Sequence, residues 1–176
     1  MAANTQRLFF SLWPDDRVRR QISAATQDAV AAADGRVISP DNYHITLAFL
    51  GGVPRDQVAA LIAAARTVRF PAFSLELDGM GNLARSLVVL SNADCCPVQL
   101  VKLVDDLWAV LEPFGLVPDS RAFKPHVSLV RSVSAGSGSQ LPEPIIWPAD
   151  EFVLISSETL STGSAYTLLE HFPAGV

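Results

Sequence analysis

Two short segments of the same form limit the folds open to this chain more than any other feature. The segments "HITL" and "HVSL" begin at His44 and His126, and each leads into a run of strand-forming residues. About half of the chain separates the two positions. A duplicated unit gives this arrangement, so the sequence predicts two related lobes with one such strand in each.

The first segment is expected to be a two-faced strand. In a strand, side chains two residues apart project from the same face. This places His44 and Thr46 together. Ile45, Leu47 and Phe49 are then expected on the opposite, apolar face, where they hold the strand against a core.

The second segment repeats the pattern with one complication. His126 and Ser128 are expected on one face, opposite Val127 and Leu129. Strict alternation places Arg131 with the apolar residues. For the guanidinium of Arg131 to reach the histidine face, the strand must end, twist or bulge between Ser128 and Arg131.

Two such strands side by side would form a cleft holding two imidazoles and two hydroxyls. Because an ordinary imidazole has a pKa of about 6.5, one histidine can accept a proton from a nucleophile while the other donates one to a leaving group. Each such step commonly contributes about 10²–10⁴-fold in rate. The hydroxyls can donate hydrogen bonds to phosphate oxygens, and Arg131 can stabilise transition-state charge. A site of this kind needs no metal.

The remaining sequence alternates between strand-like and helix-like segments, which indicates a mixed α and β fold. Further strands are expected over 7–13, 73–80, 86–92, 151–160 and 165–172. Helices are expected over 16–33, 54–68 and 97–115. The third helix is expected to bury the side that carries Val98, Val101, Val104, Trp108 and Leu111. Residues 132–148 are rich in Gly, Ser and Pro and predict a surface loop.

The charge balance bears on the partners. The net charge is −5 and the pI about 5.0, so the surface as a whole does not attract polyanions. A nucleic-acid partner must therefore meet a local cluster of cations or an end-specific contact. Lys124 and Arg85 are candidates for such local cations.

The cysteines and the N-terminal region bear on the compartment. Cys95 and Cys96 are adjacent, a spacing that disfavours a disulfide between them, and we expect reduced thiols in a cytoplasmic protein. The apolar stretch "LFFSLW" is too short to cross a membrane, and no signal peptide is recognised.

The segments "RLFFSLWP", "DNYHITLAFLG", "RSLVVLS", "FKPHVSLVR" and "GSAYTLLEHFP" span most of the chain. Together they resemble the two-histidine (2H) phosphoesterases, specifically the bacterial RNA 2′,3′-cyclic phosphodiesterases of the LigT/ThpR type, also called 2′-5′ RNA ligases. The resemblance implies an α+β, bilobal, duplicated fold in one domain over 1–176. Two antiparallel sheets would face a central cleft, with the helices outside.

The resemblance also implies roles for site residues. It makes His44 and His126 catalytic, and Thr46, Ser128 and Arg131 phosphate-binding. Ser128 stands where close relatives often carry Thr, and the hydroxyl is kept. The implied reaction is metal-independent hydrolysis of a 2′,3′-cyclic phosphate to a 2′-phosphomonoester, reversible as 2′-5′ ligation. No cofactor is expected, and the expected partners are RNA ends or nucleotides. We expect a monomer that does not associate with membranes.

The sequence also leaves open which aromatic residues bind a base and whether the protein has another function. Phe10 and Phe49 are candidates for base stacking. A metal-dependent hydrolase that uses both histidines and Asp105 or Asp106 is an alternative, although the sequence lacks a zinc-helix motif. A second alternative is a non-catalytic module that binds nucleotides or RNA ends. His171 lacks the repeated frame and is expected to be structural or exposed.

Overall fold

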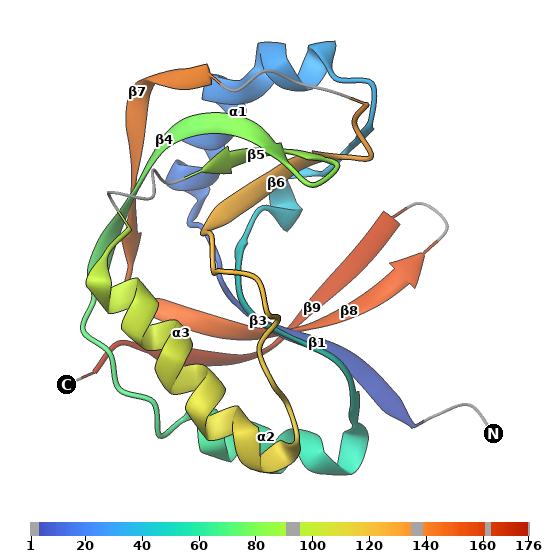
Figure 1. Ribbon diagram of the computed structural model, residues 1–176, viewed down its shortest axis with the longest axis vertical. Helices are drawn as coiled ribbons and strands as arrows, with labels where there is room; N and C mark the ends of the chain where they lie inside the picture. The colour runs from blue at the N-terminus through green and yellow to red at the C-terminus, as the bar shows by residue number, and fades with distance from the viewer. Residues whose placement is uncertain (1–3, 91–95, 135–138, 161–162, 176) are drawn as a thin grey trace.

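The computed structural model describes residues 4–90, 96–134, 139–160 and 163–175. These residues contain one path of antiparallel strands in the order β7-β4-β5-β6-β3-β1-β8-β9, with the short strand β2 paired to β6 (Figure 1). The strands are β1 (Thr5–Leu12), β2 (Arg36–Val37), β3 (Ile45–Pro54), β4 (Phe73–Leu83), β5 (Ser86–Leu90), β6 (His126–Arg131), β7 (Ser139–Ala149), β8 (Glu151–Leu160) and β9 (Gly163–Pro173).

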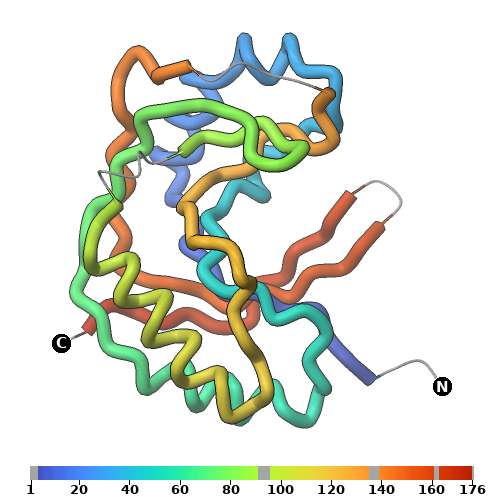
Figure 2. The backbone as a smooth tube through the Cα atoms, viewed as in Figure 1, coloured from blue at the N-terminus to red at the C-terminus, as the bar shows by residue number. Residues whose placement is uncertain are grey.

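The path divides into two halves that meet at a single residue pair. The upper half in Figure 1 comprises β7, β4, β5 and β6, and the lower half comprises β3, β1, β8 and β9. Within the described residues, Ile45 of β3 pairs with Val127 of β6, and no other pair joins these two strands. Figure 2 shows these segments, far apart in the sequence, meeting near the middle of the molecule. The lower half therefore combines strands from both ends of the chain, whereas the four strands of the upper half lie between Phe73 and Ala149.

The helices lie outside this sheet. They are α1 (Asp16–Ala32), α2 (Val58–Ala65) and α3 (Val98–Leu111), with short 3₁₀ turns η1 (Pro40–Asn42), η2 (Arg55–Gln57) and η4 (Glu112–Phe114). Helix α1 lies beside the upper half, whereas α2 and α3 pack together beside the lower half (Figure 1). Asp15 caps α1 by accepting a hydrogen bond of 2.7 Å from the amide of Val18.

One main core connects the two halves. It joins apolar residues of all three helices to the inward-facing residues of the strands, including Ile45, Leu47, Val127 and Leu129. The apolar residues of both histidine segments thus anchor their strands as expected.

Helix α3 buries only part of the predicted side: Val104 and Leu111 are buried and Trp108 packs partly buried against the core, but the two valines of the first turn are not buried. Val98 is 75% exposed and Val101 is 43% exposed. The buried residues are Leu100, Leu103, Val104, Leu107 and Leu111. The helix carries two overlapping apolar stripes, and the packing of the rest of the fold selects the leucine-rich one.

The predicted loop over 132–148 is wrong for its second part, because residues from Ser139 onward form β7. The prolines of this segment suggested a loop, but β7 is an edge strand that pairs only with β4, so the missing amide donors are tolerated. Leu141, Ile145 and Trp147 are buried from one side of this strand. Residues 135–138 of the predicted loop, 91–92 of the predicted strand and Cys95 lie outside the described residues.

Two smaller observations concern the rest of the described chain. The Cys96 thiol is free and half-buried. No helix in the described ranges combines the length and the apolar composition that a membrane span needs.

Candidate active site

The junction of the two halves positions both motif histidines. His44 directly precedes β3, and His126 is the first residue of β6. Since the joining pair is Ile45 with Val127, the residue after each histidine takes part in the junction. Burial is the main cause of the lowered pKa of His44, and a smaller electrostatic contribution from His126 places the two imidazoles within electrostatic reach of each other.

Both imidazoles are oriented by the same backbone contact. Nδ1 of His44 lies 2.7 Å from the carbonyl oxygen of Asn42, and Nδ1 of His126 lies 2.7 Å from that of Lys124. A carbonyl oxygen only accepts hydrogen bonds, so Nδ1 must carry the proton in each ring. In the neutral form Nε2 is therefore the atom with the free lone pair.

Aromatic rings surround His44. Trp13 stacks nearly parallel to the imidazole, with a centroid distance of 5.6 Å and an interplanar angle of 9°. Phe9 lies at 4.9 Å and Tyr166 meets the ring edge-on at 5.4 Å. Phe9 belongs to a small apolar cluster with Val153 and Ile155, which is separate from the main core.

This enclosure changes the acidity of His44. Burial is the largest influence and lowers the pKa of His44 to about 4, and the charges of Arg131 and His126 act in the same direction. The hydrogen bond to the Asn42 carbonyl opposes this decrease. In the free protein, His44 is therefore neutral at pH 7.

A bulge in β6 brings Arg131 to the histidine face. The pairing of β6 with β5 shifts by one residue, so that Ser128 pairs with Val88 while Val130 pairs with the preceding residue of β5. Leu129 and Val130 are both buried, which breaks the alternation. Ser128 and Arg131 consequently line the same cavity. The predicted irregularity between Ser128 and Arg131 is confirmed.

An equivalent bulge in β3 moves Phe49 to the histidine face. The pairing with β1 shifts next to Leu47, and Leu47 and Ala48 are both buried. Phe49 is 49% exposed and lines a cavity with Thr46. The expectation that Phe49 shares the buried face of Ile45 and Leu47 is therefore wrong, because strict alternation was assumed across a bulge.

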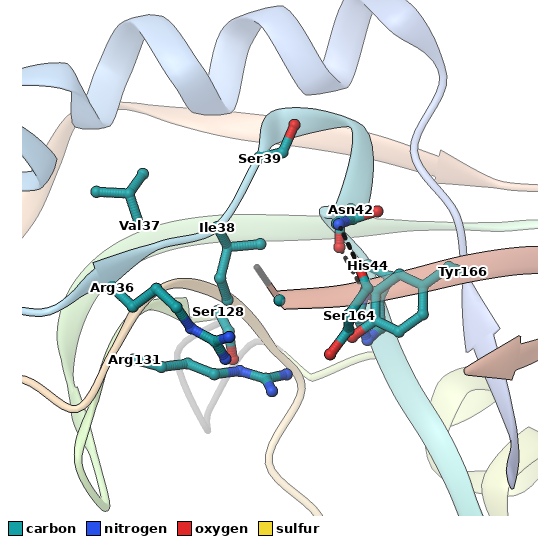
Figure 3. A pocket seen from close by; sticks show the side chains of 11 residues that line it. Arg36, Val37, Ile38, Ser39, Asn42, His44, Ser128, Arg131, Ser164 and Tyr166 are labelled. Atoms are coloured by element: carbon teal, nitrogen blue, oxygen red, sulfur yellow. Dashed lines mark hydrogen bonds between the residues drawn. The ribbon is translucent and has the colours of Figure 1, made fainter. Parts of the chain in front are cut away.

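Two adjoining cavities meet at His44, and both are also lined by Arg131, Ser164 and Tyr166. The Ser128 cavity, of about 180 Å³, extends from this centre towards β2 (Figure 3). The Thr46 cavity, of about 210 Å³, extends along β1 and β3. Its further lining includes Arg7, Phe9 and Phe49.

The charges around the two cavities are of one sign. Arg131 lines both, Arg36 lines the Ser128 cavity and Arg7 lines the Thr46 cavity, whereas no Asp or Glu among the described residues lines either. The guanidinium of Arg7 lies 4.9 Å from the centre of the Phe49 ring. Arginines, hydroxyls and an aromatic face without a competing carboxylate are suited to a phosphate joined to a nucleobase.

The structure brings most of the predicted site residues together. His44, Thr46, Ser128, Arg131 and Phe49 line the two cavities. His126 is half-buried beside them at the junction and does not itself line either cavity.

Other candidates lie elsewhere. Phe10 cannot stack on a base, because it is 0% exposed and its ring packs against Phe152 and Phe172 in the core. Lys124 and Arg85 are exposed and line neither cavity.

Among the described residues, the other acidic and histidine side chains form no second group that could serve as an active site. His171 is exposed, and its Nδ1 lies 3.1 Å from a carboxylate oxygen of Glu151. Asp106 pairs with Lys102 at 2.6 Å on α3. Within the described ranges, no three His, Cys, Asp or Glu side chains are grouped closely enough to hold a metal ion.

Sequence reasoning missed Trp13, Tyr166, Phe9, Arg7 and Arg36. Trp13 and Tyr166 meet at His44 only because β1 pairs with both β3 and β8, and β8 pairs with β9. Hydrophobicity could not show that Phe9, rather than the adjacent Phe10, contacts His44. For the two arginines, the only signal in the sequence was their position near the quoted motifs, which does not indicate the direction of a side chain.

Comparisons with known proteins agree with this architecture. A model of the family described as LigT like Phosphoesterase matches residues 12–89, a range that includes the first motif. An RNA 2′,3′-cyclic phosphodiesterase of Escherichia coli is 32% identical over 170 residues, which cover 95% of this chain and 96% of that protein. One from Thermus thermophilus is 27% identical and covers 94% of this chain and 89% of that protein.

A solved structure extends the likeness to three dimensions. E. coli LigT complexed with 3′-AMP has a TM-score of 0.86 to this protein at 32% identity, over 97% of this chain and 98% of that one. The chain belongs to the LigT-like phosphoesterase family. The family resemblance and the α+β fold predicted from the sequence are thus confirmed.

Proposed function

We propose that this protein is an RNA 2′,3′-cyclic phosphodiesterase that opens the cyclic phosphate to a 2′-phosphomonoester by acid–base catalysis with His44 and His126. The observation that carries the proposal is the matched pair of imidazoles at the junction of the two halves. Each is oriented by a carbonyl on Nδ1 and leaves Nε2 for chemistry, next to cavities whose described lining includes arginines and no acidic residue. The names of the E. coli and T. thermophilus relatives support the same substrate class.

The two histidines divide the proton transfers. His126 accepts a proton from water at Nε2 as the water oxygen bonds to phosphorus. The bond from phosphorus to O3′ breaks, and O3′ takes a proton from Nε2 of His44. The 2′ ester bond is retained, so the product is a 2′-phosphomonoester.

This assignment makes a demand on His44. Its pKa of about 4 in the free protein leaves it without the proton that a general acid must donate at pH 7. A bound phosphate places negative charge beside the ring and favours the imidazolium form. Substrate binding must therefore raise the pKa of His44, and the enclosed site makes this electrostatic response strong.

The other lining residues bind and orient the substrate. The hydroxyls of Thr46 and Ser128 donate hydrogen bonds to phosphate oxygens, and Arg131 balances the charge that develops in the transition state. The exposed face of Phe49 offers a stacking surface for the base in the Thr46 cavity, and Arg7 lies next to it.

The same residues can also catalyse 2′-5′ ligation, which is the reverse of cleaving a 2′-5′ phosphodiester to a cyclic phosphate and a 5′-hydroxyl. If a 5′-hydroxyl of RNA replaces water, attack on the cyclic phosphate gives a 2′-5′ phosphodiester bond. By microscopic reversibility the two histidines serve both directions. Ligation therefore needs no additional catalytic group.

Phosphorus NMR of the product formed from a 2′,3′-cyclic mononucleotide in the presence of EDTA tests the proposal. We expect turnover without added metal and a single 2′-phosphomonoester signal. A 3′-phosphomonoester would contradict the assignment of the leaving oxygen. Saturable binding without turnover would show instead a module that binds nucleotides, and full dependence on added metal would reject the acid–base account.

A further inference from the structure

The Ser128 cavity contains a cation that the proposed reaction does not use. Arg36 of β2 is the cross-strand partner of Arg131 of β6. Directly opposite residues in an antiparallel pair have Cβ atoms about 5 Å apart, and like charges in this arrangement destabilise the sheet. Among the described residues, no carboxylate forms an ion pair with either guanidinium. A bound anion would relieve this repulsion.

The Arg36 side chain reaches across the cleft rather than into solvent alone. A Cβ atom placed on Gly163, at the start of β9 in the lower half, would lie 3.7 Å from Nη1 of Arg36. Figure 3 shows the guanidinium groups of Arg36 and Arg131 extending in the same direction within the cavity. Arg36 therefore occupies the far part of the cavity, and Arg131 the part shared with the histidine centre.

The rest of the lining suits a phosphate more than a base. Beyond the shared centre, Ser39, Asn42 and Ser128 contribute polar side chains. The side-chain amide of Asn42 donates to the carbonyl oxygen of Ser164 at 3.4 Å, which ties the two walls together. The exposed aromatic face suited to a base belongs to Phe49, which lies in the other cavity.

We propose that the Ser128 cavity binds a second phosphate group of the RNA, a phosphodiester next to the reacting phosphate, with Arg36 as its principal partner. This inference rests on the proposed function, because Arg131 is assigned to the reacting phosphate. The phosphodiester has two sources: the strand that ends in the cyclic phosphate, or the 5′-hydroxyl strand that replaces water in ligation. Either way, Arg36 favours RNA strands over single nucleotides.

The experiment compares a charged linkage with a neutral one. In the first arm, the substrates are two dinucleotides that end in a 2′,3′-cyclic phosphate, with an internal phosphodiester or a methylphosphonate. In the second arm, a 5′-hydroxyl dinucleotide with either linkage inhibits hydrolysis of a cyclic mononucleotide. In one of the arms, we expect the wild-type protein to favour the charged linkage about tenfold, in kcat/KM for the first arm or in the inhibition constant for the second. A charge-assisted hydrogen bond contributes an effect of this size. The arm that responds identifies the source.

The Arg36→Gln variant should lose this preference, so that the charged and neutral linkages give nearly equal kcat/KM values or inhibition constants and their ratio approaches one. The matched control is Arg20→Gln, an exposed arginine on α1 that lines neither cavity, and it should keep the wild-type ratio. A wild-type ratio near one in both arms would overturn the inference. A preference that persists in Arg36→Gln would also overturn it.

Hydrolysis of the mononucleotide reports separately on the proposed function. If the wild-type protein fails to hydrolyse it, calorimetric binding of the charged and neutral dinucleotides still gives the linkage ratio for both variants. A failed reaction with an Arg36-dependent ratio would reject the catalysis alone. Turnover without such a ratio would reject the second phosphate site alone.

Discussion

The two motif strands share a backbone plan but differ in what surrounds their histidines. Both His44 and His126 direct Nδ1 to the carbonyl two residues earlier, and both strands bulge after the hydroxyl residue. Five residues after the histidine, however, one strand presents Phe49 and the other presents Arg131. Under the proposed function, the shared plan fixes the geometry of the proton-transfer pair, and the differences place the base on the side of Phe49 and the phosphate on the side of Arg131.

The environments of the imidazoles differ as well. His44 is enclosed by Phe9, Trp13 and Tyr166, and its pKa is lowered to about 4 mainly by burial. No ring contact involving His126 occurs among the described residues. The two imidazoles therefore lie in different surroundings, and the low pKa of His44 must rise on substrate binding before this residue can act as the proposed acid.

The largest expected effect comes from removing either imidazole. His44→Ala and His126→Ala should each lower kcat for a cyclic mononucleotide by about 10²–10⁴-fold, because one proton transfer is lost in each. Steady-state kinetics measures the effect, and circular dichroism checks the fold. His171→Ala, which removes an imidazole paired with Glu151 outside the site, should remain close to wild type. Near wild-type turnover in either motif variant would remove that histidine from the mechanism.

The second expected effect concerns Arg131, which follows the bulge in β6 at the position that Phe49 occupies in β3. Arg131→Gln should lower kcat by about 10²-fold, since it removes charge stabilisation from the transition state. Arg85→Gln, an exposed arginine that lines neither cavity, is the matched control. An unchanged kcat with only a raised KM would show that Arg131 binds substrate and transition state equally.

A smaller effect is expected on the other side. Phe49→Ala should raise KM for a cyclic nucleotide about tenfold and affect kcat less, because a stacked base contributes about 1–3 kcal/mol. Ile146→Ala is the control, because it removes an exposed apolar side chain from β7 that lines neither cavity and should leave KM unchanged. If KM in Phe49→Ala matched that of the control, the base would not stack on this ring.

The last prediction concerns stability and pH rather than catalysis. The pKa of His44 is about 4 in the folded protein and about 6.5 when unfolded, so between these values the unfolded chain binds more protons. The free energy of unfolding should therefore decrease as pH falls from about 6.5 to about 4. Urea unfolding should show that His44→Asn lacks this part of the decrease and that His126→Asn retains it. Equal pH dependence in wild type and His44→Asn would contradict the lowered pKa.

Local features were predictable from the sequence. The alternation next to His44 and His126, the helix expected from residue 16 and the strand-length apolar runs are set by neighbouring residues, and the structure contains them. The irregularity before Arg131 was also foreseen, because an arginine in that frame needed one to reach the cleft.

Features set by distant pairing were not predictable. The bulge that exposes Phe49 depends on the register of β3 with β1, and the buried side of α3 depends on what packs against it. Arg36 joins the site only because β2 pairs with β6. Tyr166 reaches His44 through β9, which no local pattern connects to the first motif.

The most direct test of the central claim is an NMR titration of both imidazoles with and without a bound 2′-phosphomonoester nucleotide. If the two histidines flank one phosphate, both ring signals should shift with the same saturation curve, and the pKa of His44 should rise from about 4. A response of only one imidazole, or a pKa of His44 that stays near 4 in the complex, would contradict the account.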